Sequence, residues 1–248
     1  MKSICDIEYS AGLQLDLHLP EKEEFDLFVY FHGGGLEHGS RKGAEPFVKT
    51  LADNNVATAS VEYSMYPTAK FPDFINDCAK AVAWLKENIG TYGKCKNILV
   101  GGSSAGGYIS MMLCFDPTYF ERVGILPTDV AGYIHDAGQP TSHFNVLKEL
   151  GKDSRRIIVD QTAPLYFVGT SEKYSPMLFI VSTNDMFGRY EQTMLMVKTL
   201  EHFGHKDNVH LEIMESTHCA YVKKLDENGE SVFANVILKH IDKLLKPE

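Results

Sequence analysis

The 248-residue sequence lacks several features that mark common classes of protein. Its five cysteines include no Cys-x-x-Cys pair, so their spacing favours reduced, partly buried thiols over a disulfide framework or a zinc site. The net charge of −9 argues against nucleic acid or an anionic membrane as a partner. The N-terminal residues contain no apolar signal core, and no apolar run reaches the roughly 18 residues of a membrane span. We therefore expect a cytoplasmic protein with a small-molecule substrate.

The chain also contains no internal repeat, no low-complexity tract and no linker that would divide it, so we expect a single domain over residues 1–248. Short apolar runs instead alternate with amphipathic segments, which predicts an α/β fold with a mostly parallel sheet and helices on both faces. The expected strands are 13–20, which suggests an edge hairpin, and 25–31, 56–63, 97–102, 130–138, 177–183 and 209–214. The expected helices include 72–90, 188–204 and 231–246. Reactive groups of such folds gather at the carboxyl ends of the strands.

Two adjacent serines lie between glycines in "NILVGGSSAGGYIS", at the point where a predicted strand runs into a predicted helix. A residue at such a sharp turn needs small neighbours two positions away on each side. Ser104 has Gly102 and Gly106 there, which completes a G-x-S-x-G motif, the nucleophile elbow of α/β-hydrolases. Ser103 fits this spacing less well. Ser104 is therefore the candidate nucleophile and Ser103 its structural neighbour.

A second glycine-rich stretch, "FHGGGLEHG", follows the predicted strand 25–31. Glycines there leave backbone N–H groups free to stabilise the negative charge that develops on a carbonyl oxygen during acyl transfer. The amides of Gly34, Gly35 and Ala105 are the candidate oxyanion-hole donors. No dinucleotide or phosphate-loop motif accompanies the glycines, and no metal-ligand spacing joins the nearby histidines. We expect neither a metal nor a cofactor.

An acid and a base follow the serine in the chain order that α/β-hydrolases use. Asp185 comes after the predicted strand 177–183, and His218 comes after the predicted strand 209–214. Both residues thus fall at the carboxyl ends of strands, as Ser104 does. The remaining candidate histidines lie on predicted helices or strands or precede the acid, which makes them poor bases: His143, His202, His205 and His210.

Together these motifs resemble α/β-hydrolase esterases of the hormone-sensitive-lipase type and the related small feruloyl- and acetyl-esterase-like hydrolases. The likeness covers about residues 25–222 and departs from the family pattern at Leu36, after HGGG, and at Ser64, where the family usually has arginine. The resemblance implies a serine carboxylesterase with the triad Ser104, Asp185 and His218. Few residues precede the first core strand, which indicates a minimal cap or none; the insertion at about 139–176 is long enough to form a small lid.

The expected activity is hydrolysis of short-chain carboxylic esters through an acyl-enzyme, with acetyl esters of carbohydrates as one candidate class. The same triad serves an amide hydrolase, such as a kynurenine-formamidase-like enzyme or a small peptidase, and the motifs do not separate the two. A non-catalytic ligand-binding receptor on a hydrolase scaffold is an alternative of another class. The acyl length, the alcohol portion and a homo-oligomeric state stay open.

Overall fold

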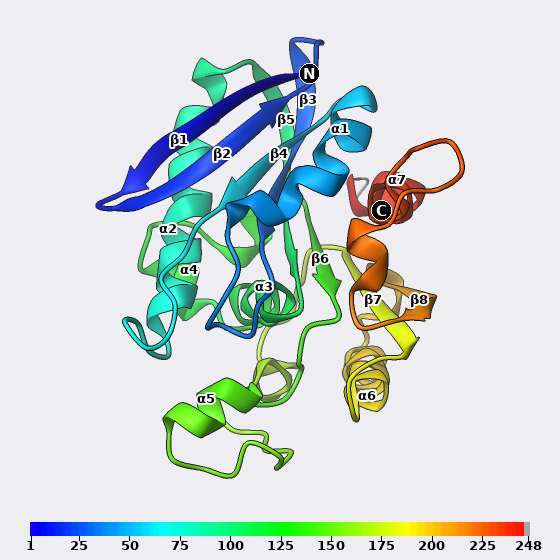
Figure 1. Cartoon of the computed structure of the whole chain (residues 1–248). Helices are drawn as coiled ribbons and strands as arrows, with labels where there is room; N and C mark the ends of the chain where they lie inside the picture. Colours follow the sequence, from blue (N-terminus) through cyan, green and yellow to red (C-terminus); the bar gives the residue numbers. More distant parts are fainter. Residues whose placement is uncertain (246–248) are drawn as a thin grey trace.

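The computed structural model describes residues 1–245. Eight strands form one sheet in the order β1-β2-β4-β3-β5-β6-β7-β8 (Figure 1). β2 pairs antiparallel with β1 and with β4, and the other neighbours are parallel. The predicted mostly parallel sheet is therefore confirmed. The strands are β1 (Lys2–Ser10), β2 (Leu13–Leu19), β3 (Glu24–Phe31), β4 (Val56–Val61), β5 (Lys94–Ser103), β6 (Gly132–Asp136), β7 (Met177–Asn184) and β8 (Val209–Thr217).

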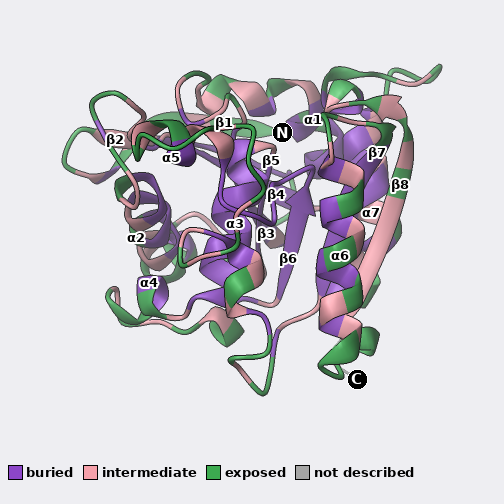
Figure 2. Cartoon of the chain, turned by 90° about the horizontal axis from the view of Figure 1, so that it is seen from below, coloured by how far each residue is buried: buried purple, intermediate pink, exposed green. Residues whose placement is uncertain are grey.

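Helices cover both faces of the sheet, and the central strands between them are buried (Figure 2). One face packs against α1 (Glu45–Asp53) and α7 (Val232–Leu245). The other packs against α2 (Asp73–Asn88), α3 (Ala105–Phe115) and α6 (Arg189–His202), and two short helices, α4 (Thr118–Glu121) and α5 (Phe144–Glu149), complete the fold. Within residues 1–245, none of these helices is long and apolar enough to cross a bilayer.

The apolar stripe predicted along residues 72–90 is buried on α2, with Ile75, Ala79 and Leu85 fully inaccessible. Burying a side chain the size of leucine contributes about 2 kcal/mol, so this stripe anchors α2 on the sheet. The helix predicted at 188–204 is also present as α6. Its Leu195, however, is 51% exposed and points away from the core. The predicted helix 231–246 is α7, and its last residue lies outside the described chain.

Two elements at the N-terminal side differ from the sequence prediction. The edge hairpin predicted at 13–20 is confirmed, since β1 pairs antiparallel with β2 at the edge of the sheet, but the bounds of β1 were not predicted, because a register shift between Ile4 and Ile7 and a left-handed residue, Asp6 (φ 59°), interrupt its alternation. Helix α1 was not predicted either. The predicted strand at 130–138 is shorter in the structure, since β6 ends at Asp136.

The segment predicted as a small insertion carries α5, which lies beside the loop after β3. Nδ2 of Asn145 donates to the carbonyl of Gly35 at 2.5 Å, and Nζ of Lys148 lies 3.0 Å from Glu37. Glu149 accepts from the backbone N–H of Phe71. These contacts hold α5 over the glycine-rich loop. That the segment acts as a lid stays a prediction. The single-domain organisation also stays a prediction.

Candidate active site

Ser104 lies at the turn from β5 to α3 in a conformation that residues other than glycine rarely adopt (φ 56°, ψ −110°). Its N–H donates to the carbonyl of Asp136, 2.8 Å away, which ties the turn to β6. A Cβ at Gly102 would lie 2.4 Å from the carbonyl oxygen of Phe31, and one at Gly106 would lie 1.9 Å from the same oxygen. The small residues of the G-x-S-x-G motif are therefore required by the close approach of β3 to the turn.

The structure brings the three predicted side chains together from the ends of three strands. Nε2 of His218 lies 2.8 Å from Oγ of Ser104, and Nδ1 of His218 lies 2.5 Å from Oδ1 of Asp185. Ser103 is buried beside Ser104, and its Oγ has no hydrogen-bond partner among residues 1–245. The geometry thus places Ser104, and not Ser103, against the imidazole.

Asp185 is held in its ionised form. Burial of this carboxylate opposes ionisation, but the hydrogen bonds from His218 and from the N–H groups of Met186 and Ser182 outweigh it and keep the pKa of Asp185 below its usual value. An ionised carboxylate only accepts hydrogen bonds, so the His218 proton sits on Nδ1 and Nε2 is free to accept the hydroxyl proton of Ser104. This arrangement suits nucleophilic attack by the serine.

A second buried carboxylate, which the sequence analysis missed, lies beside the triad. Asp136, at the end of β6, accepts a hydrogen bond from the hydroxyl of Tyr221, and burial raises the pKa of Asp136 to about 6. Sγ of Cys219 lies between Oδ2 of Asp136 (3.9 Å) and Nε2 of His218 (3.8 Å). Burial raises the pKa of the Cys219 thiol well above its usual value, so this thiol stays protonated and does not compete with Ser104.

The predicted oxyanion loop has a backbone of positive φ, which glycine adopts at little cost and which Leu36 shares (φ 67°). Gly34 (φ 123°) and Gly35 (φ 67°) are both left-handed, and a Cβ at Gly34 would lie 1.9 Å from the carbonyl oxygen of His38. Among residues 1–245, the N–H groups of Gly34, Gly35 and Ala105 donate no hydrogen bond to another residue. Ala105 begins α3 directly after Ser104, where helix N–H groups have no partner within the helix. Three unused donors therefore flank the serine.

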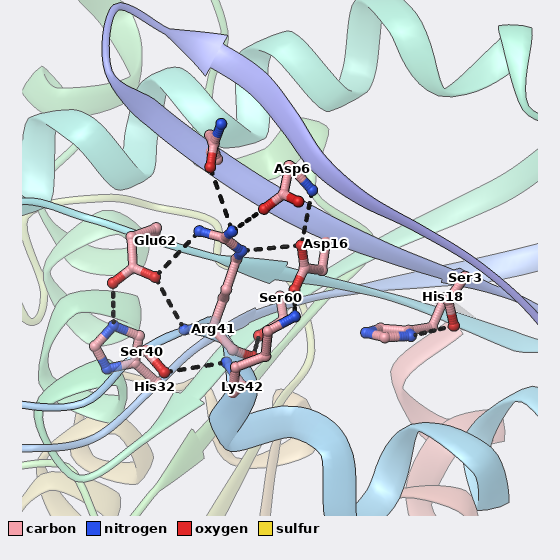
Figure 3. A network of polar contacts seen from close by, with 11 residues as sticks. Ser3, Asp6, Asp16, His18, His32, Ser40, Arg41, Lys42, Ser60 and Glu62 are labelled. Atoms are coloured by element: carbon pink, nitrogen blue, oxygen red, sulfur yellow. Dashed lines mark hydrogen bonds and ion pairs between the residues drawn. The ribbon is translucent and has the colours of Figure 1, made fainter.

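A polar network behind this loop connects it to β2 and β4 (Figure 3). The imidazole of His32 stacks on Tyr63 at 4.3 Å, and its Nε2 lies 3.6 Å from Glu62. Arg41 lies between Glu62, 3.5 Å from its Nη1, and Asp16, 2.9 Å from its Nε (Figure 3). His32 therefore ties the loop after β3 to Tyr63 and Glu62.

Beside the serine lies an open cavity of about 470 Å³. Gly34, Gly35, Ser104 and His218 line one part of it. Apolar side chains, namely Phe144, Met186 and Val222, line another part, and the polar side chains of Tyr30, Ser40 and Lys223 also border the cavity. Across residues 1–245, no group of three His, Cys, Asp or Glu side chains is arranged to hold a metal ion. The cavity therefore offers apolar walls, a serine–imidazole pair and free backbone donors.

The other candidate residues lie elsewhere. His143 is buried as the N-cap of α5 and accepts from the N–H of Asn145, and His202, His205 and His210 lie on or near α6 and β8. Of the aromatic side chains that could line a pocket, Tyr133 and His135 are core residues, whereas Phe187 is 95% exposed next to the site. The carboxyl-end position of Asp136 in "YIHDAG" is the sequence signal that could have identified it.

The sequence comparisons match this chain to the BD-FAE family and to lipases and esterases. The BD-FAE family model matches residues 15–147, more than half of the chain, including the glycine-rich loop and Ser104. Hormone-sensitive lipase from Homo sapiens is 29% identical over 129 residues, which are 50% of this chain and 12% of the lipase. The arylesterase from Saccharolobus solfataricus is 36% identical over 83 residues, 33% of this chain and 27% of the arylesterase. The chain thus spans less than a third of the length of these relatives.

Solved structures share the fold along almost the whole chain. The thermophilic esterase Est2 from Thermogutta terrifontis superposes with a TM-score of 0.76 at 16% identity, covering 100% of this chain and 94% of that one. A bacterial heroin esterase superposes with a TM-score of 0.75 at 17% identity, covering 99% of this chain and 84% of that one. At such low identity the likeness establishes the fold alone, which is the α/β-hydrolase fold.

Proposed function

The chain belongs to the BD-FAE family and has an α/β-hydrolase fold, and from this premise we propose that it is a serine carboxylesterase acting on short-chain carboxylic esters. The observation that carries the proposal is the hydrogen-bonded chain Ser104–His218–Asp185 beside three unused backbone donors. The names of the relatives, which include an arylesterase and a carboxylesterase, support ester hydrolysis as the activity.

The mechanism proceeds in two acyl-transfer steps. Oγ of Ser104 attacks the ester carbonyl carbon while Nε2 of His218 takes the hydroxyl proton, and Asp185 stabilises the imidazolium. The amides of Gly34, Gly35 and Ala105 donate to the oxyanion of the tetrahedral intermediate. The C–O bond to the alcohol then breaks, and His218 returns its proton to the leaving alkoxide. Water repeats the attack on the acyl-enzyme, releases the acid and restores the serine.

The Ser104→Ala variant tests this proposal. We expect kcat for p-nitrophenyl acetate to fall by at least about 10⁴-fold, because the nucleophile is removed while the fold is kept. Ser103→Ala is the matched control: the neighbouring hydroxyl is buried without a hydrogen-bond partner, so its removal should change kcat less than about 10-fold. Equal rates in Ser104→Ala and the wild type would refute the role of Ser104.

A labelling experiment and a substrate panel address the alternatives. A fluorophosphonate probe should label the wild type and not Ser104→Ala; a wild type that stays unlabelled would favour a ligand-binding receptor. The panel compares acetyl esters, including acetylated sugars, with feruloyl esters, N-formyl compounds and aminoacyl amides. Faster turnover of the amides than of any ester would replace the esterase proposal with an amide hydrolase.

A further inference from the structure

A second cavity, of about 450 Å³, opens beside the one that contains Ser104. The two cavities share Phe144 and Met186 in their walls, so they adjoin. The second cavity lies between the segment after α5 and the start of α6, which are at the same end of the sheet (Figure 1). A substrate whose ester group is bound at Ser104 can therefore extend into this second cavity, which the mechanism above does not use.

The second cavity is cationic in an acidic protein. The chain has a net charge of −9 and contains five arginines, of which three, Arg155, Arg156 and Arg189, line this cavity. Asp153 already pairs with Arg155 through two hydrogen bonds of 2.9 and 2.7 Å. Arg156 is exposed, and within residues 1–245 it has no carboxylate partner. No acidic residue lines the cavity itself; Glu191 borders an adjacent hollow.

Arg189 is the buried member of this group, with 3% of its surface exposed. Its guanidinium donates to the carbonyl of Ala137 and to Oε1 of Gln139 (3.3 Å), both neutral acceptors. No Asp or Glu oxygen of residues 1–245 lies within 4.0 Å of it. Burial lowers the pKa of Arg189 below its usual value, and the carboxylate of Asp185, which lies beyond that distance, offsets this effect only in part. A bound anion in direct contact would supply the counter-charge that the guanidinium lacks at ion-pair distance.

Gln192 provides a second donor at the same wall. It is 8% exposed, and its Oε1 accepts from the hydroxyl of Thr141 at 2.8 Å. Its Nε2 donates to no other residue within residues 1–245. The opposite parts of the wall are apolar, because Phe187 is 95% exposed and Ile157 is 58% exposed there. The cavity thus combines exposed apolar surface with buried donors.

We propose that this second cavity binds a carboxylate on the substrate, with Arg189 as its counter-ion and Gln192 as a further donor, so that the preferred substrates are esters bearing one carboxylate on an apolar or aryl group. The proposal rests on the proposed esterase function. Arg189 is the one buried cation among the three arginines that line the cavity, so a single carboxylate in contact with its guanidinium would neutralise it, while Arg156 is exposed nearby. The planar guanidinium also matches the geometry of a carboxylate. Phe187 and Ile157 then cover the apolar part of the substrate.

Two pairs of substrates test the proposal, each setting an anionic ester against a neutral ester of similar length. p-Nitrophenyl hydrogen glutarate and p-nitrophenyl pentanoate place the carboxylate, or its neutral counterpart, on the acyl side. 4-Acetoxybenzoate and 4-acetoxybenzamide place it on the alcohol side. In at least one pair we expect the wild type to favour the anionic ester in kcat/KM. The Arg189→Met variant should reduce that preference by about 10- to 100-fold, the range for a hydrogen bond to a charged group.

Arg122→Gln is the matched control, because it removes one positive charge from an exposed arginine that stacks on Tyr119, away from the cavity. Its charge preference should stay within about 2-fold of the wild type. If Arg189→Met lowers kcat/KM equally for both members of each pair, Arg189 is only a structural support for residues 137–139 and the proposal is wrong. If Arg189→Met does not fold, competitive inhibition of the wild type by 4-hydroxybenzoate should still exceed inhibition by 4-hydroxybenzamide, and Arg156→Gln should narrow that difference.

Calorimetry on Ser104→Ala separates this inference from the esterase proposal, since it needs no turnover. Binding of 4-hydroxybenzoate that disappears in the Ser104→Ala, Arg189→Met double variant supports the carboxylate site even if the wild type hydrolyses no ester. Hydrolysis of neutral and anionic esters at equal kcat/KM, with no binding of the carboxylate, refutes the site and leaves the esterase proposal standing.

Discussion

Replacing Gly106 with alanine tests how closely β3 and the serine turn must approach. A Cβ at this position would lie 1.9 Å from the carbonyl oxygen of Phe31 and 2.5 Å from its carbonyl carbon, whereas ordinary contact begins at 3.4 Å. The turn would have to move by about 1.5 Å, and both obstructing atoms are backbone of a central strand. A displacement of about 1 Å can cost about 100-fold in rate, so we expect kcat/KM for p-nitrophenyl acetate to fall at least 100-fold.

The same substitution should lower stability as well. Overpacking costs about 3 kcal/mol, which for a chain of this length corresponds to a fall in Tm of roughly 6–12 °C. The control is Gly90→Ala, in the short turn after α2, where no atom lies within 4 Å of the new Cβ. There alanine should leave activity unchanged and raise stability by up to about 1 kcal/mol. A Gly106→Ala protein with wild-type activity and Tm would refute the argument that the motif glycines are required by packing.

Two further predictions concern buried charges. The pKa of Asp136 is about 6 in the folded protein, higher than in the unfolded chain, so raising the pH favours the unfolded chain. As the pH rises from 4 to 7, the wild type should therefore lose about 2 kcal/mol of unfolding free energy relative to Asp136→Asn. Parallel pH profiles of the two proteins in urea denaturation would contradict this. Arg41→Met should cost about 2 kcal/mol at pH 7, because Asp16, 1% exposed, would keep only Lys42 as a cationic partner. Although Asp16 is buried, its hydrogen bonds to Lys42 and Arg41 lower its pKa. The loss of unfolding free energy in Arg41→Met should therefore shrink as the pH falls below about 4 and Asp16 becomes protonated. A loss that does not depend on pH would exclude charge pairing as its cause.

Most of the sheet could be predicted because its buried strands have clear apolar runs. The runs at 25–31 and 177–183 correspond to β3 and β7 almost residue for residue. The extent of β1 could not be predicted in this way, since its bulge shifts which side chains face inward and most of the strand is exposed. The orientation of Leu195 depends on what surrounds α6, and periodicity along one helix does not contain that information.

The residues of the candidate site could be predicted because strong local constraints produce recognisable motifs. Gly102 and Gly106 are dictated by the clash with Phe31, and Gly34 by its positive φ and the nearby carbonyl of His38. Arg189 has no such local signature, and Asp136 has only its position at the carboxyl end of a strand. Their importance arises from burial and from contacts across the fold, with Tyr221 for one and Ala137 for the other. Sequence patterns alone do not show which polar side chains become buried.

The serine and the histidine belong to parts of the sheet with very different protection. β5 ends in five consecutive buried residues in the middle of the sheet, whereas β8 is one of its two edge strands and has no fully buried residue along its length. Local opening is easiest where few apolar contacts resist it, so the imidazole is held by the more weakly secured border of the molecule. Local opening of β8 would therefore separate the imidazole from the serine without disturbing the centre of the sheet.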